Sequence, residues 1–127
     1  MDNKTNILVI DDDSGIGEML KTLLEFYGYE VIVTELPEET EKIIIKSNVD
    51  LVILDMLISG VNGTDVCRRL REVEATSTIP VLMMSALHDA GEKCKDAGAN
   101  DFIAKPFEMD DLIKKIDEVL LESRQVK

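Results

Sequence analysis

Several residue types that commonly build chemical sites are scarce in this sequence. The chain has no tryptophan, three prolines, one histidine and two cysteines. Because Cys67 and Cys94 form no CxxC pair and show no Cys/His ligand spacing, a zinc site is not predicted. We expect both thiols to be buried and reduced within helices, as is usual in the cytoplasm. The single histidine, His88, has no second histidine with which to share a metal or a base, so we interpret it as a loop residue.

Basic residues and long apolar runs are also lacking. The 14 lysines and arginines face 26 aspartates and glutamates, a net charge of −12, which argues against binding to nucleic acid because that needs a basic face. No apolar run approaches the ~20 residues that span a bilayer, and the start MDNKTN lacks the basic and apolar segments of a secretory signal. We therefore expect a cytoplasmic protein with no nucleic acid or membrane partner, whose acidity suits a cation or a basic protein.

The residues that are abundant fit one globular domain. Apolar residues make up 45% of the chain and charged residues 31%, which are ordinary proportions for a globular fold. A length of 127 residues corresponds to one domain with a substantial core. We expect this domain to occupy 1–127, with its core at about 6–121 and a frayed tail at 122–127.

Two hydrophobic periodicities alternate along the chain. Short apolar runs, typical of strands covered on both faces, occur at 6–10, 30–34, 50–55, 79–86 and within 100–106. Helical spacing occurs at 16–27, where Gly28 provides a C-terminal cap, from Pro37 through Ile45, and at 62–73, 91–99 and about 108–121. This alternation predicts an α/β fold: a doubly wound, five-stranded parallel sheet of the flavodoxin-like kind, strand order 2-1-3-4-5, with five helices.

Polar side chains follow the carboxyl ends of four of the five predicted strands. They are Asp11, Asp12 and Asp13 after the first strand, Asp55 after the third, Ser85 after the fourth and Lys105 after the fifth. Sites in open α/β sheets form beyond these strand ends. Adjacent carboxylates repel by roughly 4 kcal/mol per pair at an effective dielectric near 20, and a hard divalent cation offsets that repulsion. The sequence therefore predicts a magnesium site at this edge of the sheet.

Four segments together resemble the receiver domain of two-component response regulators over nearly the whole chain. They are VIDDD, DLVILDMLISGVNG, IPVLMMSA and GANDFIAKPF, in this order. The resemblance implies a stand-alone phospho-acceptor switch in a phosphorelay, which is not an enzyme beyond catalysing its own phosphorylation and dephosphorylation. Its partners would be a histidine kinase or a histidine phosphotransfer protein and an unknown downstream protein. The latter would be reached through the face of the fourth helix, fifth strand and fifth helix.

The resemblance also implies a role for each motif position. Asp55 would be the phosphoacceptor, with Lys105 and Ser85 contacting the phosphoryl group and Phe102 acting as an aromatic switch with Ser85. Mg²⁺ (or Mn²⁺) would be held by Asp12, by Asp11 through a water, by Asp55 and by the backbone carbonyl of Leu57. The Lys105–Pro106 bond would be cis. The chemistry is consistent with these roles, because phosphoryl transfer needs positive charge at the phosphoryl oxygens and a carboxylate nucleophile needs no general base.

Other interpretations of these residues remain open at the level of sequence. Asp13 is interpreted as a residue at a helix start rather than as a ligand, Ser85 could be a simple strand-end hydroxyl, and Phe102 could be only a core aromatic. A phosphatase resembling the haloacid dehalogenase superfamily would use Asp11 as nucleophile and Asp13 as general acid, but it would leave Asp55 without a role. A receiver-like module that binds partners without phosphorylation is the third possibility.

The chain departs from the family pattern at a few positions. Ser59 stands where a proline often follows the phosphoacceptor, and the segment from Ser85 to Phe102 is a little shorter than the pattern. In the turn SGVNG we expect Gly60 and Gly63 to have positive φ. Leu57 and Leu87 are apolar and cannot orient a water at the mouth of the site, which predicts dephosphorylation over minutes to hours rather than seconds.

Overall fold

The parallel sheet that the sequence predicts forms the centre of the molecule. A computed structural model describes residues 4–58, 60–87 and 90–125. Its main sheet consists of β1 (Asn6–Ile10), β2 (Glu30–Thr34), β3 (Leu51–Asp55), β6 (Val81–Ser85) and β7 (Asp101–Ala104). These strands are parallel and lie in the order β2-β1-β3-β6-β7. The order is 2-1-3-4-5 when the strands of this sheet are numbered along the chain, so the predicted topology is confirmed.

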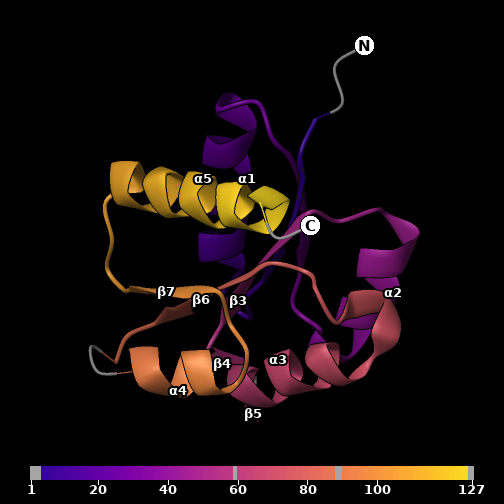
Figure 1. Cartoon of the computed structure of the whole chain (residues 1–127). Coiled ribbons are helices and arrows are strands. Elements are labelled where there is room, and N and C mark those ends of the chain that lie inside the picture. Colours follow the sequence, from indigo (N-terminus) through magenta and orange to yellow (C-terminus); the bar gives the residue numbers. More distant parts are fainter. Residues whose placement is uncertain (1–3, 59, 88–89, 126–127) are drawn as a thin grey trace.

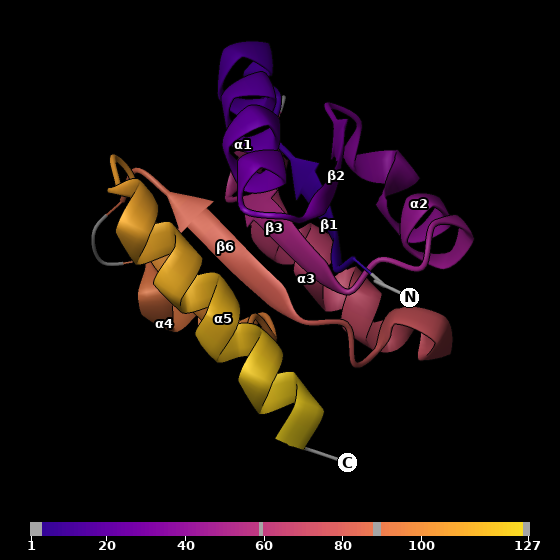
Figure 2. The same ribbon diagram turned by 90° about the horizontal axis from the view of Figure 1, so that it is seen from above.

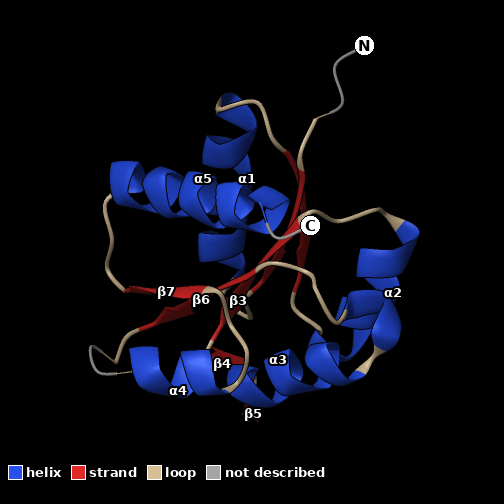
Figure 3. Ribbon diagram, in the orientation of Figure 1, coloured by secondary structure: helices blue, strands red, loops and turns tan. Residues whose placement is uncertain are grey.

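Helices cover both faces of the sheet. They are α1 (Ser14–Phe26), α2 (Thr40–Lys46), α3 (Gly63–Glu72), α4 (Gly91–Asp96) and α5 (Met109–Gln125). Helices α1 and α5 lie on one face, and α2, α3 and α4 lie on the other (Figures 1 and 2). When the ribbon is coloured by secondary structure, the strands are enclosed between these two helical layers (Figure 3). Within the described ranges, no helix combines the length and the apolar character that crossing a bilayer requires.

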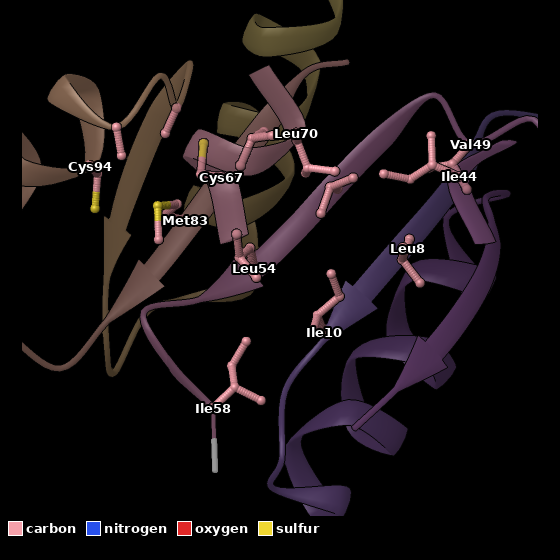
Figure 4. Close-up of a cluster of buried hydrophobic side chains, with 14 of the residues drawn as sticks. Leu8, Ile10, Ile44, Val49, Leu54, Ile58, Cys67, Leu70, Met83 and Cys94 are labelled. Carbon is pink, nitrogen blue, oxygen red and sulfur yellow. The ribbon is translucent and has the colours of Figure 1, made fainter. Parts of the chain in front are cut away.

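Alternating strand residues supply two separate hydrophobic clusters. Leu8, Leu54 and Met83 point toward α2, α3 and α4, where Cys67 and Cys94 complete the cluster shown in Figure 4. Their strand neighbours Val9, Ile53, Leu82 and Met84 belong to the cluster under α1 and α5. Because successive strand residues point to opposite faces, a continuous apolar run is what a sheet covered on both sides requires. Both cysteines are buried and free, as expected, and burial raises the pKa of each thiol.

Local signals explain where the first helix begins and ends. The side chain of Asp13 is the N-cap of α1 and accepts a hydrogen bond from the Ile16 amide at 3.2 Å. This confirms the interpretation of Asp13 as a helix-start residue. At the other end, Gly28 has φ of +98°, which is the left-handed conformation that favours glycine after a helix.

The structure corrects several details of the sequence-based prediction. Helix α5 continues to Gln125, so residues 122–125, which we expected to fray, are helical. Gly60 has the expected positive φ, but Gly63 does not. The two residues between these glycines form β5 (Val61–Asn62), which pairs with β4 (Leu57–Ile58) in a small antiparallel hairpin. Strands of two residues are too short to show a periodicity.

Two short 3-10 helices flank the helices of this face. Pro37–Glu39 precedes α2, and Glu74–Thr76 follows α3. Ser59 and His88 lie outside the described residues.

The real reason for a glycine at position 63 is close packing. A Cβ atom built on Gly63 would overlap the backbone carbonyl oxygen of Asp55 and would lie 3.0 Å from both Met56 Cα and Met83 Cε. The Gly63 amide also donates to the Met56 carbonyl oxygen at 2.6 Å. The first turn of α3 is therefore held directly against the chain that leaves β3.

This packing predicts that Gly63→Ala is strongly destabilising. Because the clash is with backbone atoms, relief requires a shift of α3 or of the end of β3, and we expect a loss of at least about 2 kcal/mol in the free energy of unfolding. Gly91→Ala is the matched control. Gly91 is also the first residue of its helix, and among the described residues its added Cβ would meet just the ring of Phe102, with Cδ1 at 3.4 Å and Cε1 at 3.9 Å. Urea unfolding followed by far-ultraviolet circular dichroism measures both, and equal stability of the two variants would contradict this account.

Candidate functional site

Polar residues from four strands meet at the carboxyl edge of the sheet. Asp11 follows β1, Asp55 ends β3, Ser85 ends β6 and Lys105 follows β7. These four strands are neighbours in the sheet. Parallel pairing brings their carboxyl ends to the same edge, as the sequence led us to expect.

Three carboxylates at this edge converge on one point. A carboxylate oxygen from each of Asp11, Asp12 and Asp55 lies within 4.8 Å of the others. The side chain of Asp11 is fully buried, that of Asp55 is 12% exposed, and Asp12 is exposed. A set of oxygen ligands with one side open to solvent is the environment that Mg²⁺ or Mn²⁺ prefers. The donor chemistry of these three residues therefore fits the predicted metal.

Burial makes the charge of Asp11 costly. Burial raises the pKa of the Asp11 carboxyl from its ordinary value, and the neighbouring Asp55 acts in the same direction. Two contacts partly oppose this rise: the Asp13 amide donates to Asp11 Oδ1 at 2.9 Å, and Lys105 lies nearby. A negative charge held in a buried position without full compensation favours binding of a cation.

Lys105 is the positive group of the site. Its Nζ donates to Asp55 Oδ2 at 3.1 Å and to Asp11 Oδ2 at 3.4 Å. Burial alone would lower the pKa of this ammonium, but the hydrogen bonds and charges of Asp55 and Asp11 outweigh that effect and raise it. Lys105 therefore stays charged beside Asp55 at neutral pH. Among the described residues, the bond to Pro106 is the one cis peptide.

Ser85 ends β6, and Leu57 and Leu87 lie two residues beyond Asp55 and Ser85 along the chain. Ser85 is buried, and its hydroxyl oxygen accepts a hydrogen bond from the Leu87 amide at 3.0 Å. Its backbone carbonyl accepts from the Lys105 amide at 2.7 Å, which joins β6 to the residue after β7. Leu57 is 60% exposed and Leu87 is 56% exposed. Both therefore present apolar surface to solvent.

Phe102 lies apart from the carboxylates, on β7. It is partly buried and packs against the hydrophobic cluster beneath α2, α3 and α4. The position that a Cβ on Gly91 would take is 3.4 Å from its ring, so the aromatic side chain lies under the start of α4. This placement is compatible both with a core aromatic and with the switch that the sequence predicts, and the switch stays a prediction.

Backbone contacts that sequence reasoning did not find complete the site. The Asp13 amide orients Asp11 by the hydrogen bond given above, and the Met56 amide donates to the Met84 carbonyl at 2.8 Å. Neither of these two hydrogen bonds had a signal in the sequence. The close approach of Gly63 to the end of β3, described above, did have one, which is the second glycine of SGVNG. The side chain of Asp13 caps α1, so the geometry gives no support to its use as a general acid.

Comparisons with known proteins agree with this arrangement. The model of the response regulator receiver domain family matches residues 7–117, and the chain belongs to this family. It is therefore a signalling module of the two-component type rather than a true enzyme, and receiver domains accept phosphoryl groups from histidine kinases. The acidic cluster is typical of a receiver metal site.

Individual relatives cover almost all of the chain. The phosphate regulon transcriptional regulatory protein PhoB of Pseudomonas aeruginosa is 34% identical over 116 residues, which are 90% of this chain and 51% of that protein. The transcriptional regulatory protein ResD of Bacillus subtilis is 32% identical over 125 residues, 97% of this chain and 51% of that protein. The chain thus spans about half the length of these curated relatives.

Solved structures share the fold over their whole length. A putative response regulator from Chloroflexus aurantiacus is 36% identical with a TM-score of 0.88, covering 94% of this chain and 99% of that one. A receiver domain protein described as CheY-like, from Methanospirillum hungatei, is 27% identical with a TM-score of 0.87, covering 98% of this chain and 100% of that one.

Proposed function

We propose that this protein is a phospho-acceptor switch in which Asp55 receives a phosphoryl group from the phosphohistidine of a histidine kinase or a histidine phosphotransfer protein. One observation carries the proposal: oxygens of Asp11, Asp12 and Asp55 converge within 4.8 Å while Lys105 Nζ lies 3.1 Å from Asp55. Such a site combines a nucleophile, ligands for a divalent cation and a fixed positive charge. The cytoplasm is the proposed location, since that is where such donors act.

The chemistry assigns a distinct task to each side chain. An oxygen of Asp55 attacks phosphorus, the bond between phosphorus and the donor's imidazole nitrogen breaks, and the imidazole leaves with the electron pair. Lys105 releases Asp55 and moves its ammonium to a phosphoryl oxygen, while the Ser85 hydroxyl donates to another. No proton has to be removed from the nucleophile, because Asp55 attacks as a carboxylate.

The metal is the remaining part of this proposal. Asp12, Asp55 and the backbone carbonyl of Leu57 would hold Mg²⁺ or Mn²⁺ directly, with Asp11 acting through a water. The bound ion would supply positive charge to the phosphoryl oxygens. Burial of Asp11 and the proximity of Asp12 and Asp55 support this assignment, because the three carboxylates repel each other until a cation compensates them.

Output is proposed to follow from a population shift that couples Ser85, at the end of β6, to Phe102 on the neighbouring strand β7. In the present structure the Ser85 hydroxyl accepts from the Leu87 amide. When that hydroxyl turns inward toward a phosphoryl group, Phe102 can turn into the space that Ser85 vacates, which changes the surface formed by α4, β7 and α5. A downstream protein would read that surface.

A single mass measurement tests the proposal. The chain is incubated with acetyl phosphate or phosphoramidate and Mg²⁺, and its intact mass is recorded before and after. We expect the addition of one phosphoryl group, dependent on Mg²⁺ and reversed over minutes to hours. Absence of any adduct under these conditions would favour a receiver that binds partners without phosphorylation.

The lifetime of the adduct gives a further prediction. Leu87 is apolar and 56% exposed, so replacement by Glu or Asn places a polar group where it can orient a water for attack on the acyl phosphate. We expect Leu87→Glu and Leu87→Asn to lose the phosphoryl group severalfold faster than the wild type. The control is Leu121→Asn, at an equally exposed leucine on α5. Loss of phosphate is followed by mass, and an unchanged rate in the Leu87 variants would refute this role of the side chain.

A further inference from the structure

Arg71, in the last turn of α3, joins three segments at the edge of the sheet where β6 and β7 begin, opposite the carboxylate site. Its guanidinium donates from Nη1 to the backbone carbonyls of Ile79 at 2.7 Å and Ser77 at 3.3 Å, both before β6. It also donates from Nε to the carbonyl of Gly98 at 2.9 Å and from Nη2 to Asn100 Oδ1 at 3.1 Å, both before β7. Helix α3 is thereby tied to the loops that lead into two strands.

These contacts hold the end of α4, which lies in the same helical layer as α3 (Figure 1). Gly98 follows Ala97, the C-cap of α4, and has φ of +102°. A Cβ atom built on Gly98 would lie 2.8 Å from Arg71 Cγ, so the aliphatic stem of the arginine packs on the glycine backbone. The guanidinium places a positive charge at the carbonyl end of the helix, where a cation is favourable. Its planar fork reaches acceptors in both loops at once.

The turn after α4 is also bonded directly to the sheet. The Ala99 amide donates to the Cys94 carbonyl at 3.0 Å, which closes the helix end. The Asn100 amide donates to the Val81 carbonyl at 2.8 Å, and Asn100 Oδ1 accepts from the Val81 amide at 2.9 Å. Because Asn100 Oδ1 also accepts from Arg71, one network links α3, the end of α4 and the beginning of β6.

The start of α4 has different neighbours. Its N-cap is Ala90, which has no polar side chain to cap the helix. Its first residue, Gly91, lies beside the ring of Phe102, because a Cβ atom there would be 3.4 Å from Phe102 Cδ1. Phe102 is the side chain that is proposed above to turn when Asp55 is phosphorylated. The two ends of α4 are thus supported unequally: the end by a hydrogen-bonded network and the start by a side chain that can turn.

We propose that Arg71 is a positioning residue that makes α4 a lever fixed at its carbonyl end. The proposal rests on the phosphorylation switch described above: movement of Phe102 displaces the start of α4, while Arg71 keeps the end in place. The surface of α4, β7 and α5 then changes by a rotation of α4 about its fixed end, and not by a loosening of the whole helix. Without Arg71, the displacement reaches the turn into β7.

The first measurement tests the anchor on the unmodified, full-length chain. Amide hydrogen exchange is followed residue by residue by NMR for Arg71→Met, which keeps an aliphatic stem but removes the donors and the charge. We expect exchange of the Ala99 and Asn100 amides to accelerate at least about tenfold more than that of the β3 amides, which report global unfolding. Arg69→Met is the matched control, because Arg69 lies on the same helix and its side chain is 77% exposed. It should change neither set of amides.

A conservative variant keeps the test decisive if Arg71→Met does not fold. Arg71→Lys retains the positive charge but not the fork of donors, and a single ammonium group does not replace contacts to both loops. We expect it to accelerate exchange of the same amides, by a smaller factor than Arg71→Met. Circular dichroism verifies the fold of each variant.

The second measurement tests the lever. Beryllofluoride with Mg²⁺ serves as a stand-in for the phosphoryl group, and the chemical shifts of the backbone amides are compared before and after its addition. In the wild type we expect large changes at Gly91 and Cys94 and small ones at Ala99 and Asn100. In Arg71→Met the changes at Ala99 and Asn100 should become comparable to those at Cys94. A merely structural loss of stability would not redistribute these changes along α4.

The anchor, the lever and the phosphorylation switch can fail separately. Equal acceleration of exchange in Arg71→Met and Arg69→Met would show that Arg71 does not hold the end of α4. Wild-type shift changes as large at Asn100 as at Cys94, or an unaltered pattern in Arg71→Met, would refute the lever even where acetyl phosphate adds the expected mass. A chain that gains no mass and shows no response to beryllofluoride would refute the switch, and the lever with it.

Discussion

Replacing Asp55 with asparagine is expected to abolish phosphorylation by acetyl phosphate. The amide has the shape of the carboxylate but not its charge, so it cannot attack phosphorus, and it provides a weaker ligand for a divalent cation. Lys105 loses its partner at 3.1 Å but keeps Asp11 at 3.4 Å. We therefore expect the Asp55→Asn variant to remain folded while its intact mass stays unchanged after incubation with acetyl phosphate and Mg²⁺.

A neighbouring aspartate provides the control for this experiment. Asp13→Asn should take up one phosphoryl group as the wild type does, because Asp13 caps α1 and an asparagine serves that purpose equally well. Reduction of the wild-type adduct with borohydride, followed by peptide mapping, identifies the modified residue. Label on Asp11, with loss of turnover in Asp13→Asn, would instead indicate the phosphatase chemistry considered above. An adduct that persists in Asp55→Asn would refute the assignment of the phosphoacceptor.

Replacing Asp11 with asparagine is expected to stabilise the metal-free protein. Burial raises the pKa of Asp11 above its ordinary value, so at low pH the folded protein holds a proton that the unfolded chain releases more readily. The free energy of unfolding then falls as the pH rises from the ordinary value of 3.8 through the raised folded value, and it stays lowered at neutral pH. Asparagine removes this cost while its oxygen can still accept from the Asp13 amide. We expect a measurable gain in the free energy of unfolding of the metal-free protein at neutral pH.

The same substitution is expected to abolish stabilisation by the metal. A ligand that binds only the folded state stabilises it by about 2.7 kcal/mol when present at about 100 times its dissociation constant. Addition of Mg²⁺ should therefore raise the unfolding midpoint of the wild type and have little effect on Asp11→Asn. Urea unfolding followed by circular dichroism, with and without Mg²⁺ and at neutral and mildly acidic pH, measures both effects.

Asp13→Asn again distinguishes a local role from a general effect of charge. It removes the same charge from the same segment, but Asp13 is exposed and its carboxylate caps the helix. We expect this variant to keep the wild-type response to Mg²⁺ and the wild-type dependence of stability on pH. A similar gain in metal-free stability in both variants would show that the acidic segment as a whole, and not the buried carboxylate, opposes folding.

Much of the fold was accessible from the sequence because its signals are local. The continuous apolar runs of β1, β3 and β6 predicted strands buried on both faces, and in the structure every residue of β3 and β6 is buried. Alternation with helical periodicity then predicted a parallel sheet, because parallel strands need crossover connections. The same reasoning missed the β4–β5 hairpin and the last turn of α5. Two-residue strands have no periodicity, and a polar helix end shows no stripe.

The candidate site was predicted for a related reason. A parallel sheet brings the carboxyl ends of its strands to one edge, so Asp11, Asp55, Ser85 and Lys105 could be placed near one another from the order of the segments alone. Their roles came from the resemblance to receiver domains. Gly63 was interpreted wrongly, as a residue with positive φ, because a glycine required by contact and one required by backbone conformation look the same in a sequence.

The amino-acid sequence by itself determined the kind and order of the secondary-structure elements, together with which polar side chains lie at the carboxyl edge of the sheet. Both follow from the spacing of apolar residues within short segments. Only the tertiary structure decided which of three consecutive aspartates turns inward, that Lys105 bridges partners 94 and 50 positions away, and that Arg71 of α3 holds the turn after α4. These features depend on how distant segments pack against one another, and no local pattern of residues encodes the distances between them.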